Sequence, residues 1–112
     1  MQKLIERIRQ FTKERDWEQF HSPKNLTMAL SIEVSEIMEH FQWKTTEESR
    51  HLDAETIAKV KDEIGDTFTY LLNLCDELGI DPIEAANAKM LKNAEKYPIE
   101  KAKGNSKKYT EL

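Results

Sequence analysis

The sequence is short of the residues that break helices or cross-link small folds. Its 112 residues include three glycines, three prolines and one cysteine. A lone Cys75 excludes an intrachain disulfide scaffold and fits a reducing compartment. No apolar run exceeds three residues, as at 70–72, so none could cross a membrane. The first residues carry frequent charges and show no signal-peptide pattern. We therefore expect a cytoplasmic protein with no membrane partner.

Positive charge is also scarce, because the formal net charge is −4. A surface built to neutralise a nucleic-acid backbone needs an excess of lysine and arginine, so we expect no nucleic-acid partner. A phosphate ligand of such a chain should arrive with a cation. Apolar residues make up 38% of the chain, slightly less than is usual in globular proteins. The core should therefore be modest and be completed by other copies.

Apolar residues recur at spacings of three and four in four segments, and no segment alternates as a strand would. This pattern predicts an all-α chain. Residues typical of helix ends flank the segments. We expect helices over about 2–15, from an N-cap at Asn25 to about Gln42, from a cap at Asp53 to Gly79, and from Asp81 to about Tyr97, with a short turn led by Thr45 or Thr46 in the polar link.

A chain of this size supports one hydrophobic core, so we predict a single domain over residues 1–98. Residues 99–112 contain four lysines, one glycine and little to bury. We expect them to form a polar C-terminal tail that is mobile or acts as an arm on a neighbouring copy.

Two pairs of acidic residues have matching positions on the second and third expected helices. Glu33 and Glu36 lie beside the apolar stripe of one helix, and Glu63 and Asp66 lie on the corresponding side of the other. Packing the two stripes together would bring four carboxylates around one point. Glu39, by contrast, projects away and should be solvated.

Four carboxylates at one point repel one another, by roughly 4 kcal/mol per pair of neighbours at 4 Å and an effective dielectric near 20. A cation between them would remove that cost, and oxygen ligands favour Mg²⁺, Ca²⁺ or Mn²⁺ over zinc. Acidic pairs on helices are also common on solvated faces. The spacing alone leaves both interpretations open.

The fourth helix carries Lys89, Asn93 and Lys96 at spacings of four and three residues, on one side of its apolar stripe. Such side chains can bind phosphate oxygens. Lysines near a helix C-terminus also stabilise the helix dipole without any ligand. Tyr70 lies one turn beyond Asp66 and points the same way, either as a packing residue or as a ligand contact.

Aromatic and hydrogen-bonding side chains gather in the segment that follows the first helix, where Trp17 and His21 precede Asn25. Nucleic-acid bases stack on such rings, so we expect this segment, Asn25 included, to contact a substrate. Trp43 could add another ring at the end of the second helix. A hydrophobic clamp between loop and helices is the alternative role for these rings.

The chain resembles the all-α nucleoside triphosphate pyrophosphohydrolases of the MazG-like superfamily, and within it the dCTP pyrophosphatase branch. The resemblance lies in three stretches: RDWEQFHSPKNLTMALSIEVSEIMEHFQWK, DEIGDTFTYLL and AKMLKNAEKYP. It implies a four-helix antiparallel bundle, assembled as a homodimer or a dimer of dimers. Ile8 and Ala94 depart from the animal enzymes of the branch, which have histidine and arginine there.

The resemblance also assigns roles to the residues singled out above. It implies Mg²⁺, with Mn²⁺ as a possible substitute, held by Glu33, Glu36, Glu63 and Asp66. It further implies phosphate contacts by Lys89, Asn93 and Lys96, and contacts with base and sugar by Trp17, His21, Trp43 and Tyr70.

These features and the resemblance together predict Mg²⁺-dependent hydrolysis of a nucleoside triphosphate to monophosphate and pyrophosphate. The resemblance implies dCTP or a modified dCTP as the favoured substrate. Two other classes of protein stay possible from the sequence: a helical dimer that binds a nucleotide without turning it over, and a purely structural helical dimer.

Overall fold

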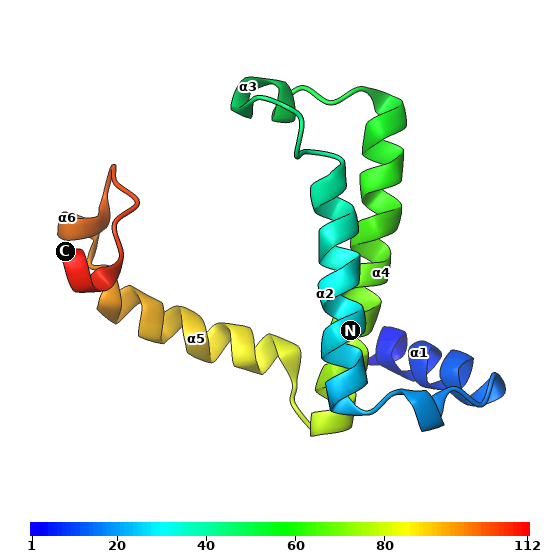
Figure 1. Ribbon diagram of the computed structural model, residues 1–112. Coiled ribbons are helices and arrows are strands. Elements are labelled where there is room, and N and C mark those ends of the chain that lie inside the picture. The colour runs from blue at the N-terminus through cyan, green and yellow to red at the C-terminus, as the bar shows by residue number, and fades with distance from the viewer. The chain divides into compact units, whose positions relative to one another are not determined.

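The computed structural model describes residues 1–112 and contains helices but no strand. The all-α prediction is therefore confirmed. There are four long helices, α1, α2, α4 and α5 (Figure 1). Short helices lie between the first three of them and after α5. Their bounds are α1 Gln2–Glu14, η1 Glu18–Phe20, α2 Pro23–Glu39, α3 Thr46–Ser49, α4 Ala54–Leu78, α5 Pro82–Lys96, α6 Ile99–Ala102 and η2 Tyr109–Glu111. None of these helices is both long enough and apolar enough to span a membrane.

The chain divides into two compact units, Met1–Gly79 and Ile80–Leu112. In the first unit, α2 and α4 run antiparallel and side by side, and α1 packs against the C-terminal half of α4 (Figure 1). Leu26 of α2 and Leu72 of α4 are almost completely buried. The second unit holds α5 with the C-terminal residues. The single domain over residues 1–98 stays a prediction.

A charged pair also joins α1 to α4. The Arg9 guanidinium donates two hydrogen bonds to the Asp76 carboxylate, at 2.7 and 2.5 Å. This bidentate geometry fixes both the position and the orientation of the pair. It holds the pKa of Asp76 below its ordinary value.

Helix ends follow local rules that the sequence displays. The Asp53 carboxylate accepts a hydrogen bond from the Thr56 backbone N–H at 2.7 Å, and Asp81 caps α5 through two backbone N–H groups. Thr45 forms a reciprocal capping box with the glutamate three residues later. Gly79 ends α4 with a φ of 66°, a left-handed conformation that glycine adopts without strain.

The predicted cap of α2 is wrong. Ser22, not Asn25, is the N-cap, and its side chain accepts a hydrogen bond from the Asn25 backbone N–H at 3.1 Å. Pro23 explains the difference, because its fixed φ and missing N–H suit the first turn of a helix. The helix therefore begins three residues earlier than a cap at Asn25 would give. It ends at Glu39, not near Gln42.

Several large apolar side chains of α2 remain uncovered within this single chain. Met28, Ile32 and Met38 are all more than half exposed. Isolated exposed apolar residues are ordinary, but a series on one helix is typical of a surface that binds another chain. Assembly with other copies stays a prediction that this exposure supports.

The C-terminal residues are more structured than the sequence predicts. They contain the turns α6 and η2, and the Tyr109 ring lies edge-on to the Tyr97 ring, with centroids 6.2 Å apart. The segment therefore folds back onto the end of α5.

Candidate metal centre and nucleotide-binding site

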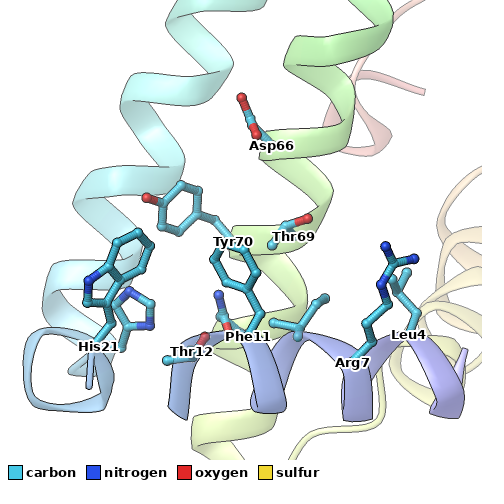
Figure 2. Close-up of a pocket in the computed structure, with 11 residues that line it drawn as sticks. Leu4, Arg7, Phe11, Thr12, His21, Asp66, Thr69 and Tyr70 are labelled. Carbon is cyan, nitrogen blue, oxygen red and sulfur yellow. The ribbon is translucent and has the colours of Figure 1, made fainter. Parts of the chain in front are cut away.

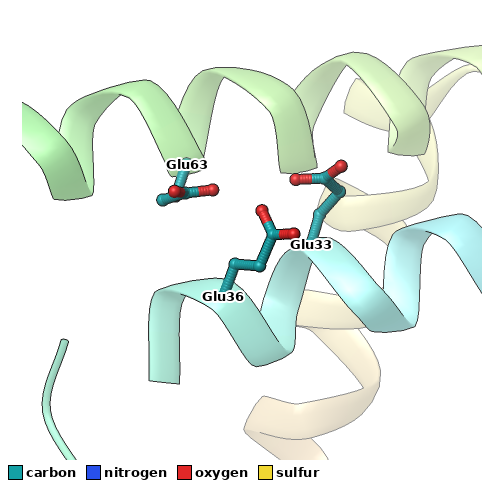
Figure 3. A group of neighbouring side chains, drawn as sticks. All are labelled: Glu33, Glu36 and Glu63. Carbon is teal, nitrogen blue, oxygen red and sulfur yellow. The ribbon is translucent and has the colours of Figure 1, made fainter. Parts of the chain in front are cut away.

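Three of the four predicted carboxylates meet between α2 and α4. Glu33 and Glu36 project from α2 towards Glu63 on α4 (Figure 3). One carboxylate oxygen from each residue lies within 4.8 Å of the other two. The convergence predicted from helical spacing is therefore present for these three residues.

Asp66 lies close to this group without being part of it. Its charge contributes to raising the pKa values of Glu33 and Glu63. It is also one of the residues that line a neighbouring cavity. Asp66 thus lines the cavity and also acts electrostatically on the glutamates.

Crowding of negative charge changes the acidity of the cluster. Burial, followed by the charge and hydrogen bonding of Glu36, raises the pKa of Glu33 from 4.5 to about 7. The hydrogen bond with Glu36 is the largest of the causes that raise the pKa of Glu63. These raised pKa values reflect repulsion among the carboxylates that nearby positive charge does not offset.

The donors present fit a divalent cation. The Glu33 Oε2 atom is buried and has no hydrogen-bond partner. A buried acceptor without a donor is costly, and a cation between the carboxylates would satisfy it. All the converging ligands are carboxylate oxygens, which suit Mg²⁺, Mn²⁺ or Ca²⁺ better than zinc.

His40 is a further residue near the cluster, and it was not predicted from the sequence. Its Nε2 atom lies 3.9 Å from Glu63 Oε1, and both side chains are about three-quarters buried. His40 follows Glu36 by four residues, a spacing that places both on the same side of α2. This spacing could have identified His40 from the sequence.

A cavity of about 410 Å³ adjoins the acidic cluster in the first unit. Trp17, His21 and Tyr70 line it together with Asp66. Figure 2 shows His21 and Tyr70 near Phe11 and Thr12 of α1, and Asp66 further along α4, away from α1. Three of the predicted base and sugar contacts therefore do come together.

The rings in this cavity form a continuous series. Phe11 and Trp17 have centroids 5.8 Å apart, Trp17 and His21 6.5 Å, and His21 and Tyr70 6.4 Å, all edge to face. The His21 Nδ1 atom is buried without a hydrogen-bond partner. An aromatic wall with one unused polar atom suits a flat heterocycle that offers both a π-face and a polar edge.

Polar residues that line the cavity were missed from the sequence. On α4, Thr69 and Asn73 follow Asp66 at spacings that keep all three on one face of the helix. This spacing could have identified them from the sequence. On α1, Arg7 and Thr12 flank Ile8, and only the packing of α1 on α4 makes them part of the lining.

Two predicted contacts lie elsewhere. The Asn25 amide donates a hydrogen bond to the Phe20 carbonyl at 3.1 Å and does not line the cavity. Trp43 is 89% exposed and does not line the cavity either. Within this chain, Asn25 stabilises the turn before α2 and Trp43 is free to meet another molecule.

In the second unit, Lys89, Asn93 and Lys96 share one face of α5. The nearby charge of Lys96 is the largest cause that lowers the pKa of Lys89. Two ammonium groups held this close repel each other, and a bound anion would relieve that repulsion.

Comparison with known proteins finds similar sequences. Residues 28–112 match the profile of the MazG-like family. Over 105 residues the chain is 42% identical to human dCTP pyrophosphatase 1 and 40% identical to the bovine protein, which covers 92% of the chain. The chain spans 62% of the length of these relatives.

A solved structure is also similar. The crystal structure of a pyrophosphatase from Archaeoglobus fulgidus superposes with a TM-score of 0.83 at 43% identity, covering 88% of this chain and 92% of that one.

Proposed function

The chain belongs to the MazG-like family, and we propose that it hydrolyses nucleoside triphosphates between the α and β phosphates. The products are the nucleoside monophosphate and pyrophosphate. The observation that carries this proposal is the convergence of Glu33, Glu36 and Glu63 beside an aromatic cavity of about 410 Å³. The relatives named dCTP pyrophosphatase support dCTP or a modified dCTP as the favoured substrate.

Glu33, Glu36, Glu63 and Asp66 are the proposed ligands of Mg²⁺, or of Mn²⁺ in its place. The orphaned Glu33 oxygen supports this assignment. When bound, such an ion neutralises phosphate charge and lowers the pKa of a coordinated water.

Side chains of the protein bind the substrate and orient the attacking water. Trp17, His21 and Tyr70 hold base and sugar, since their rings line the cavity next to Asp66. Lys89, Asn93 and Lys96 bind phosphate oxygens and hold the polyphosphate in line for attack. One carboxylate, Glu36 or Glu33, orients the attacking water and accepts its proton.

Asn25 and Trp43 stay predicted substrate contacts. The 89% exposure of Trp43 supports a contact with a molecule outside its own chain. We propose a homodimer or a dimer of dimers as the assembly and the cytoplasm as the location.

Product analysis tests the reaction. Purified protein is incubated with Mg²⁺ and a panel of canonical and modified triphosphates, and pyrophosphate and orthophosphate are measured separately. We expect pyrophosphate and monophosphate in equal amounts. Release of orthophosphate would reject cleavage between the α and β phosphates, and tight binding without product over hours would identify a nucleotide-binding protein instead.

A further inference from the structure

The C-terminal segment makes a direct contact with one of the proposed phosphate-binding lysines. The Lys96 ammonium lies over the Tyr109 ring, with Nζ 4.8 Å from the ring centroid. This distance is within the range of a cation–π interaction. The Tyr97 ring meets Tyr109 edge-on from the end of α5 and so helps to fix the Tyr109 ring.

This contact bears on how the two lysines can stay together. Lys89 and Lys96 lie two turns apart on the same face of α5, and their like charges tend to separate them. Lysine side chains are long and flexible, so an exposed one would turn away into water. The electron-rich face of Tyr109 attracts the Lys96 ammonium and opposes that movement.

We propose that Tyr109 is a positioning residue that holds Lys96 beside Lys89, so that the C-terminal segment forms part of the phosphate-binding surface on α5. The ligand of this surface is a polyphosphate, either pyrophosphate or the corresponding part of a nucleoside triphosphate. This inference rests on the proposed function, because that function gives Lys96 its phosphate.

Two further observations support a role for the segment. It forms one compact unit with α5 over Ile80–Leu112. The match to the MazG-like family also continues to residue 112, beyond the end of the long helices.

The test compares two substitutions of the same ring. Tyr109→Leu removes the π-face, whereas Tyr109→Phe keeps it and removes only the hydroxyl. For Tyr109→Leu we expect a KM for the triphosphate about three- to fivefold higher with kcat nearly unchanged, as loss of an exposed cation–π contact and of uniform binding predicts. Tyr109→Phe should retain the wild-type KM. Lys101→Met, which removes a charge from the same segment, is the matched control and should also behave as wild type.

A double-mutant cycle separates positioning from general stability. In a Lys96→Met background, Tyr109→Leu should change KM no further, because its effect passes through Lys96. Calorimetric titration with pyrophosphate and Mg²⁺ should show the same pattern without any turnover.

The inference is overturned if Tyr109→Leu binds pyrophosphate as tightly as wild type, if Tyr109→Phe loses as much as Tyr109→Leu, or if the effects of Tyr109→Leu and Lys96→Met add. Absence of pyrophosphate release from every triphosphate would instead reject the proposed function, and pyrophosphate binding would still decide whether Tyr109 acts through Lys96.

Discussion

The two compact units of this chain each gather charges of one sign, but they do so by different means. In the first unit, carboxylates from two helices are brought within 4.8 Å by the packing of α2 on α4. In the second, Lys89 and Lys96 come from one helix, and their proximity follows from helical spacing and from the ring of Tyr109. Both groups carry like-charge repulsion that a bound ion of opposite charge would relieve. The acidic group depends on packing between two long helices. The spacing of the basic pair along α5 is local, and only the contact of Lys96 with Tyr109 depends on how the C-terminal residues fold back.

The largest expected effect comes from removing one carboxylate of the acidic cluster. Glu63→Gln should lower turnover by about two orders of magnitude or more, because loss of a ligand to a catalytic metal removes transition-state charge stabilisation. Without metal, the Glu63→Gln variant should be at least as stable as the wild-type protein, because one of the repelling charges in the cluster is gone. Steady-state kinetics and thermal unfolding measure the two effects.

Glu39→Gln is the matched control, because Glu39 lies on α2 outside the cluster. It should keep wild-type turnover. Equal activity in Glu63→Gln and Glu39→Gln would leave the metal assignment without support.

The second effect is the pH dependence of the metal-free cluster. The pKa of Glu33 is about 7 in the folded chain against an ordinary value of 4.5, so between these values the native state binds more protons than the unfolded state. Stability in chelator should therefore fall as pH rises from about 4.5 to about 7. The apparent affinity for Mg²⁺ or Mn²⁺ should rise over the same range, by up to about tenfold per pH unit for one released proton.

Thermal unfolding with chelator and with metal, from pH 4.5 to 7.5, measures both trends. Glu33→Gln should flatten the metal-free profile. Asp53 and Asp76 have lowered pKa values, so their contribution is lost only in more acid solution. A metal-free wild type that gains stability between pH 5 and 7 would contradict this description of the cluster.

The third effect concerns the basic pair. Lys89→Met should raise the KM for the triphosphate about five- to tenfold, because one charge-assisted phosphate contact is lost. It should leave the metal affinity unchanged, since Lys89 is not one of the proposed metal ligands. Lys92→Met, one turn along α5, is the control for loss of charge alone. An equal rise in KM for Lys92→Met would show that Lys89 acts only through its charge and not through a specific phosphate contact.

The smallest effect should come from removing the Arg9–Asp76 ion pair between α1 and α4. Arg9→Met should raise KM by about two- to threefold, in keeping with the modest strength of partly exposed ion pairs, because α1 forms one wall of the cavity. Asp76→Asn should do the same, and the double variant should be no worse than either single one. Additive effects would show that Arg9 and Asp76 act separately on the cavity.

Much of the fold could be predicted because helix ends depend on neighbouring residues. Asp53, Asp81 and Gly79 end or begin helices as predicted, since each acts through backbone groups only a few residues away. Asn25 was wrongly predicted as a cap because a serine followed by Pro23 competes for the same role three residues earlier. Choosing between such neighbouring signals needs the geometry of the turn that precedes the helix.

The site was only partly predictable. That Glu33 and Glu36 share one face of α2 follows from periodicity, because residues three or four apart lie on the same side of a helix. The separate position of Asp66, the closeness of His40 to Glu63 and the polar lining by Arg7 do not follow from it. These depend on how far one helix is shifted and rotated against another.

The sequence by itself therefore determined the helical class, most helix ends and the faces that carry acidic and basic residues, because these depend on interactions over one or two turns. Only the tertiary structure decided which carboxylates meet and which rings enclose the cavity, since both depend on packing between residues far apart in the chain. The contact of Tyr109 with Lys96 belongs to this second group, because it depends on how the last residues fold back onto α5.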